Sequence, residues 1–130
     1  MKFLPLLLLF IGAVAHADDP DTALTIKGCT IAESSQCPGA NLRGAKLANQ
    51  DLRKMNLAGA DLRDADLRHA RLDLANLEKA QLQGANLNRA SLQQSNLRLA
   101  DFSGAKLKAI QGWGLFAQGA QFQRADLTAA

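Results

Sequence analysis

Few side chains in this sequence could supply a base and a nucleophile. His69 is the single histidine after residue 17, and a general base must lie within hydrogen-bond reach of the group that it deprotonates. The serines that follow it, Ser91, Ser95 and Ser103, lie at least 22 residues further along the chain. In the repeat described below this separation is at least one full coil, which is poor geometry for a Ser–His pair. We therefore interpret His69 as a solvent-exposed side chain.

Metal and phosphate sites are not predicted either. The single histidine after residue 17 and the two cysteines do not match a recognisable set of zinc ligands. The carboxylates of Asp64 and Asp66 alternate with Arg63 and Arg68, which is typical of a solvated ion-pair surface. The glycines stand at single, separated positions and form no phosphate-binding loop. The sequence thus predicts a protein that is not an enzyme, with no cofactor, no metal and no small-molecule substrate.

Cys29 and Cys37 are the two cysteines of the chain. In an exported protein an even pair is expected to form a disulfide. The bridge would close a loop of about nine residues, which stabilises a fold by roughly 2–3 kcal/mol. A redox-active pair is the alternative, but the spacing is not Cys-x-x-Cys and no thioredoxin-like pattern surrounds it.

The first residues have the pattern of a secretory signal peptide. Lys2 precedes an apolar run over 3–14, and Ala15-His16-Ala17 is a small-x-small cleavage site followed by two aspartates. The run is too short to span a membrane. We expect a signal peptide over 1–17, an N-terminal lead-in and disulfide-tied cap over 18–39, and an exported protein, periplasmic or secreted. The alternatives are an uncleaved anchor and a lipoprotein modified at Cys29.

A period of five residues begins near position 40. Leucine or phenylalanine occupies every fifth position from Leu42 to Leu127, except at Gly112 and Ala117, and alanine usually precedes it by two residues. In an α-helix five residues turn about 500°, so leucines at this spacing would spread around the helix. In a flat strand they would alternate between faces. The period predicts a backbone that turns a corner in every unit, so that all leucines point at one axis.

The units Ala-Asp-Leu-Arg-Asp at 60–64 and Ala-Asn-Leu-Glu-Lys at 75–79 resemble the motif of the pentapeptide-repeat family. The resemblance implies an all-β fold, a right-handed quadrilateral β-helix of about four and a half coils over 40–130. A helical array rich in alanine and leucine is the alternative. Against it, Asn or Asp recurs within the motif, and glycines fall at the last position of units, where a corner would use them.

With four units in a coil, residues 20 apart should stack about 4.8 Å from one another. This register predicts that the rings of Phe102 and Phe122 stack inside the solenoid. It also aligns Asn56, Asn76 and Asn96 on one face, where their amides could form a ladder.

The segment over 110–116 is the most apolar part of the predicted surface. Its interface candidates are Ile110, Trp113, Leu115 and Phe116. Exposed aromatic clusters commonly mark interfaces, and some members of the family dimerise through their C-terminal coils. We expect a surface for an unknown protein partner, with a homodimer through the last coil as the leading form. The alternative is that these residues fold over the last coil as a cap.

Polyanion binding is the alternative function. Residues 40–129 contain 13 basic and 8 acidic residues. The candidates on this basic region, for lipopolysaccharide or nucleic acid, are Arg43, Arg53, Lys54, Arg63, Arg68 and Arg71. Interleaved acids weaken the prediction, and nucleic acid is not favoured because no aromatic residues accompany the basic ones.

Overall fold

The computed structural model describes residues 23–130, and the predicted signal peptide over 1–17 lies outside them. The described part begins with a small antiparallel hairpin, β1 (Thr25–Ile26) and β2 (Cys29–Thr30), in which Ile26 pairs with Cys29. Lys27 and Gly28 form its turn with φ angles of 47° and 84°. Two left-handed residues in succession match the twist of a two-residue hairpin turn.

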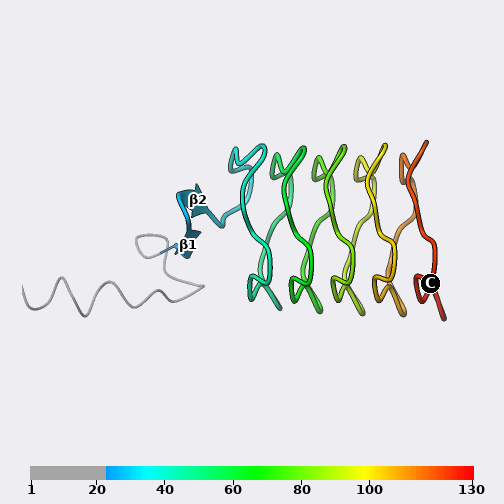
Figure 1. Ribbon diagram of the computed structural model, residues 1–130. Coiled ribbons are helices and arrows are strands. Elements are labelled where there is room, and N and C mark those ends of the chain that lie inside the picture. The colour runs from blue at the N-terminus through cyan, green and yellow to red at the C-terminus, as the bar shows by residue number, and fades with distance from the viewer. Residues whose placement is uncertain (1–22) are drawn as a thin grey trace, which may run out of the picture.

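The rest of the described chain is a right-handed quadrilateral β-helix, as expected (Figure 1). Parallel bridges join residues 20 apart without interruption, from Gln36 with Asn56 to Lys106 with Asp126. Each of these units donates to both neighbouring coils: the N–H of Leu62 donates to the carbonyl of Gln81 at 2.7 Å, and the N–H of Asp61 donates to the carbonyl of Ala40 at 2.9 Å. Because four five-residue units complete one coil, each side of the square is too short for a conventional strand.

The corners confirm the reason for the period of five. Every fifth residue from Gly44 to Ala129 has a positive φ angle, and an N–H to carbonyl bond such as Ala45 to Leu42, 3.0 Å, closes the turn around it. A left-handed third residue is what a type II turn requires. Glycine is not obligatory there, since Leu74 and His69 adopt φ angles of 63° and 60°. The stacked coils hold these residues in a conformation that costs energy locally.

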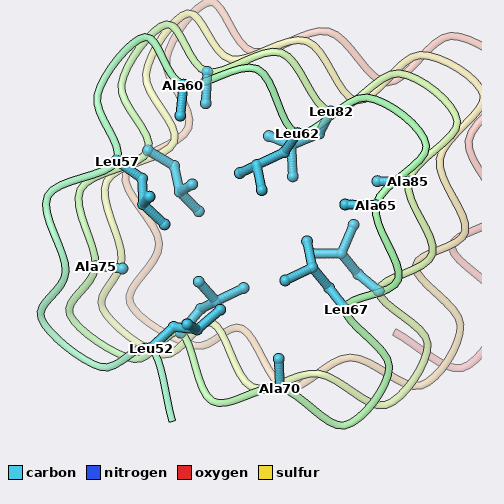
Figure 2. Packing of buried hydrophobic residues seen from close by; sticks show 14 of the residues in the cluster. Leu52, Leu57, Ala60, Leu62, Ala65, Leu67, Ala70, Ala75, Leu82 and Ala85 are labelled. Carbon is cyan, nitrogen blue, oxygen red and sulfur yellow. The ribbon is translucent and has the colours of Figure 1, made fainter. Parts of the chain in front are cut away.

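Leucine and alanine side chains point inward and fill the solenoid (Figure 2). The leucines of the motif from Leu42 to Leu107 are at most 1% exposed. Ser95 replaces an alanine without leaving its hydroxyl unpaired, because its Oγ donates to the carbonyl of Leu92 at 2.7 Å. The predicted stack of Phe102 and Phe122 is confirmed, with ring centroids 5.2 Å apart and planes at 6°. Burial of this column is the main source of stability.

The predicted amide ladder is only partly formed. The Nδ2 group of Asn96 donates to the Oδ1 atom of Asn76 at 3.2 Å, and Asn56 donates to the side chain of Gln36 at 3.1 Å. Among the described hydrogen bonds none joins Asn56 to Asn76. The Oδ1 atom of Asn56 instead accepts the N–H of Ala58 at 3.2 Å. The Oδ1 atom of Asn76 accepts the same kind of local bond, from the N–H of Glu78 at 3.0 Å, together with the bond from Asn96.

The N-terminal end of the solenoid is closed by the hairpin. The predicted disulfide between Cys29 and Cys37 is present, with the two Cα atoms 5.6 Å apart. Cys37 occupies the inward position that leucine takes in other units, and Leu24 and Ile26 pack against the core beside it. Leu42, in the first coil, is therefore only 1% exposed. The bridge attaches a small cover to the open end of an apolar column.

The two irregular units near the C-terminal end keep the register. Gly112 and Ala117 take the leucine position, but Ile110 and Leu115 take the alanine position two residues earlier, and both pack against the core. A Cβ atom on Gly112 would lie 2.9 Å from the Cδ1 atom of Leu115. The large and small residues have exchanged places, so that the last coil stays filled.

This exchange predicts the outcome of restoring the motif at one position. We expect Gly112→Leu to lower the free energy of unfolding by about 1–3 kcal/mol, because the new side chain enters space that Leu115 fills. The double variant Gly112→Leu/Leu115→Ala should recover most of the loss. Urea denaturation followed by circular dichroism measures both. A loss of stability in the double variant equal to the summed losses of Gly112→Leu and Leu115→Ala would contradict the exchange.

Candidate binding surfaces

The solenoid has four faces, which we number by the inward residues at their centres. Face 1 is centred on the Leu62 column, face 2 on the Leu67 column, face 3 on the Leu72 column and face 4 on the Leu77 column. Each face includes the outward residues beside these centres and the corner residue that follows. Outward side chains 20 apart in sequence lie one above the other on the same face.

The groups considered for catalysis lie apart or have other partners. His69 is exposed at a corner, as expected, and within residues 23–130 no hydrogen bond joins it to a serine. The Oγ atom of Ser91 donates to Asp73, and that of Ser103 donates to Asp101 at 2.6 Å. In the same part of the chain no three histidine, cysteine, aspartate or glutamate side chains gather as metal ligands.

Three ion pairs repeat one local arrangement. In the pairs Asp51 with Arg53, Asp61 with Arg63 and Asp66 with Arg68, the guanidinium binds the carboxylate through two nitrogens at 2.7–2.9 Å. The two residues of each pair flank an inward leucine, so both side chains point outward from one side of the square. The hydrogen bonds from Arg63 lower the pKa of Asp61 to about 2, so this carboxylate remains charged at neutral pH.

The predicted polyanion residues do not form one surface. Arg43 and Arg63 lie on face 1, Arg68 lies on face 2, and Arg53, Lys54 and Arg71 lie on face 3. All of them except Arg71 have a carboxylate within 3.8 Å among the described residues. Paired cations attract a phosphate less strongly, because the neighbouring carboxylate repels it. The structure therefore does not bring these six residues together.

The predicted interface residues divide into two pairs, all four in or beside the last coil. Trp113 and Phe116 point outward on either side of the corner at Gly114 and are 61% and 46% exposed. The guanidinium of Arg98 lies 5.0 Å from the centre of the Phe116 ring. Ile110 and Leu115 point inward and are only partly buried, because no further coil within residues 23–130 covers them. We call these four residues the C-terminal patch.

Two further apolar residues are exposed at corners. Leu74 and Leu99 are 51% and 53% exposed, as much as the aromatic residues of the patch. Both stand at the last position of a unit, which always faces outward. A large apolar residue at that position is a signal that the sequence prediction overlooked.

Among the described residues, the last coil has backbone groups without a partner. In earlier coils the N–H at the leucine position donates to the next coil, as Leu107 does to Asp126 at 2.8 Å. The corresponding N–H groups of Phe122 and Leu127 have no backbone acceptor among the described residues. The side chain of Leu127 is 46% exposed, although it occupies an inward position. This end therefore presents unpaired backbone groups around an apolar centre, beside the C-terminal patch.

Comparisons with known proteins were made for the sequence and the fold. A family profile for pentapeptide repeats matches residues 40–78 and 75–109, which is more than half of the chain, in 8 copies. No curated protein matches the chain. Among the described residues no helix is long and apolar enough to cross a membrane.

Three solved structures are among those that resemble the chain. A pentapeptide repeat protein from the thylakoid lumen of Arabidopsis thaliana is 26% identical, over 69% of this chain and 60% of that chain, with a TM-score of 0.48. The chain thus spans less than two thirds of that protein. Rfr23 from the cyanobacterium Cyanothece is 24% identical, over 70% of this chain and 86% of that chain, with a TM-score of 0.31. A protein from the cyanobacterium Nostoc is 36% identical, over 67% of this chain and 64% of that chain, with a TM-score of 0.29.

Proposed function

Because the chain belongs to the pentapeptide-repeat family, whose members are typically protein-interaction scaffolds, we propose that it is an exported, non-enzymatic scaffold that binds a second copy of itself through its last coil. The observation that supports this proposal is the difference between the two ends. Leu42 at the covered end is 1% exposed, whereas in the last coil Leu127 is 46% exposed and Trp113 is 61% exposed.

An open sheet edge and an apolar patch favour association for separate reasons. Unpaired backbone N–H groups gain hydrogen bonds when a second edge approaches. Burial of Trp113 and Phe116 removes apolar surface from water, and aromatic residues often contribute most of the energy of an interface. Since the hairpin covers the other end of the core, end-to-end stacking into a filament is blocked. Two identical ends related by a two-fold axis form a closed dimer.

Export is supported by two features of the N-terminal region. The first 17 residues have the order expected of a secretory signal, a basic residue followed by an apolar run and a small-x-small site. The disulfide between Cys29 and Cys37 is the kind of bond that persists in an oxidising compartment. A periplasmic or secreted protein is consistent with both.

Sedimentation of the exported form at micromolar concentration tests the association. We expect a dimer, and we expect Trp113→Ala and Phe116→Ala each to weaken it about thirtyfold, as loss of an aromatic hot spot does. Leu74→Ala is the matched control, because Leu74 is 51% exposed but lies two coils before the last one. A monomer at every concentration, or a dimer that tolerates both aromatic substitutions, would disprove the proposal.

A further inference from the structure

Face 2 differs from the other faces in its charge. It carries two acids, Asp66 and Asp126, against five cations, which are Lys46, Arg68, Arg89, Lys106 and Lys108. On each of the other three faces of the solenoid, cations exceed acids by at most one. The excess positive charge of the solenoid is therefore concentrated on one side of the square.

Within residues 23–130, four of the five cations of face 2 form no ion pair, although Asp66 lies one coil from Lys46 and Asp126 lies one coil from Lys106 in the same columns. Arg68 pairs with Asp66 at 2.7 Å, but in the described part of the chain Lys46, Arg89, Lys106 and Lys108 have no carboxylate within ion-pair distance. All four side chains are exposed. An exposed cation without a paired acid keeps its attraction for an external anion.

Three of these cations gather in two adjacent coils. Lys106 and Lys108 flank the inward Leu107, so both point outward from the same side. The N–H of Lys108 bonds the Oδ1 atom of Asn88 at 2.9 Å, which places Lys108 directly beside the corner residue Arg89. Lys46 lies three coils from Lys106 on the same face, a distance of about 14 Å at the usual strand spacing.

We propose that face 2 docks on an anionic lipid surface, with Arg89, Lys106 and Lys108 as its main contacts. The coils stack in register, so the face is flat and rigid, which suits a plane of phosphate headgroups better than a single flexible chain. The outward positions of face 2 hold no phenylalanine, tyrosine or tryptophan, and His69 is their one imidazole, whereas single-stranded nucleic acids are bound largely by stacking on several aromatic rings. This face is separate from the C-terminal patch, so the inference does not depend on dimerisation.

Sedimentation with lipid vesicles tests the proposal. We expect the exported form to bind vesicles of phosphatidylcholine and phosphatidylglycerol but not phosphatidylcholine alone, and to lose affinity as salt is raised. Each cation near an anionic surface contributes about a fivefold gain in affinity, so Arg89→Gln/Lys106→Gln/Lys108→Gln should weaken binding about a hundredfold. The matched control, Arg43→Gln/Arg63→Gln/Arg124→Gln, removes the same charge from face 1 and should retain most of the binding.

The other outcomes decide against the proposal. Equal weakening by the two triple variants would show a general effect of net charge. Binding to heparin without binding to anionic vesicles would assign the face to a linear polyanion. Displacement from vesicles by inorganic phosphate alone would indicate an isolated phosphate site. Circular dichroism of each variant checks that the fold is kept, and a variant that remains dimeric shows that the two surfaces act independently.

Discussion

Replacing Leu82 with alanine is expected to lower the free energy of unfolding by about 2–5 kcal/mol, the usual cost of a large-to-small change in a closed core. Leu82 lies in the middle of the solenoid and is 0% exposed. The coils on both sides hold their backbones by hydrogen bonds such as Leu62 to Gln81, 2.7 Å, and Leu82 to Asp101, 2.8 Å. These hydrogen bonds keep the chain from closing around the cavity that the substitution leaves. We therefore expect a loss of stability near the upper end of this range.

The same substitution at Leu127 is the matched control. Leu127 has the same place in the motif but is 46% exposed, because no coil covers it in the structure. We expect a loss of less than about 1 kcal/mol in the monomer, since little apolar area leaves a buried site. Urea denaturation at a protein concentration too low for dimerisation measures the free energy of unfolding of both variants. Equal losses in the free energy of unfolding at the two positions would contradict the difference in burial between Leu82 and Leu127.

Removing the disulfide is expected to cost about 2–3 kcal/mol, because the unfolded chain regains the freedom of a closed loop. Cys29 and Cys37 are eight residues apart, and both sulfur atoms lie against the core. The double variant Cys29→Ala/Cys37→Ala should also lose protection of the hairpin amides from hydrogen exchange before those of the central coils. This order follows from the small number of backbone bonds that hold the hairpin to the solenoid.

Reduction provides the control for this prediction. A reducing agent should shift the denaturation midpoint of the unmodified protein to that of the double variant, and it should leave the double variant unchanged. An unmodified protein that keeps its midpoint after complete reduction would show that the hairpin covers the core without help from the bridge.

Some surface arrangements were beyond the sequence. The ion-pair surface around Asp64 and Asp66 was predicted and is present, but the sequence left open whether Asp61 or Asp64 pairs with Arg63, and the partner is Asp61, two residues earlier along the same side of the square. Local pairing prevails because the two side chains emerge together from one rigid unit. The six predicted polyanion residues are spread over three faces. The net charge counted along the sequence does not show this, because it does not record on which face each charged residue lies. The excess on face 2 becomes visible only after the chain is wound.

The amino-acid sequence by itself determined the winding of this protein. One apolar position in every five residues can be buried only if the backbone turns at each unit, and this requirement places Leu62 beneath Leu82 and Phe102 beneath Phe122. Only the tertiary structure decided whether each end of the apolar core is covered. Whether Leu42 and Leu127 are covered depends on what packs across the axis, and no periodic pattern describes that. The exchange of Gly112 with Leu115 also depended on the tertiary structure. The large residue fills the space inside the coil from a different position of the motif, which the period alone does not show.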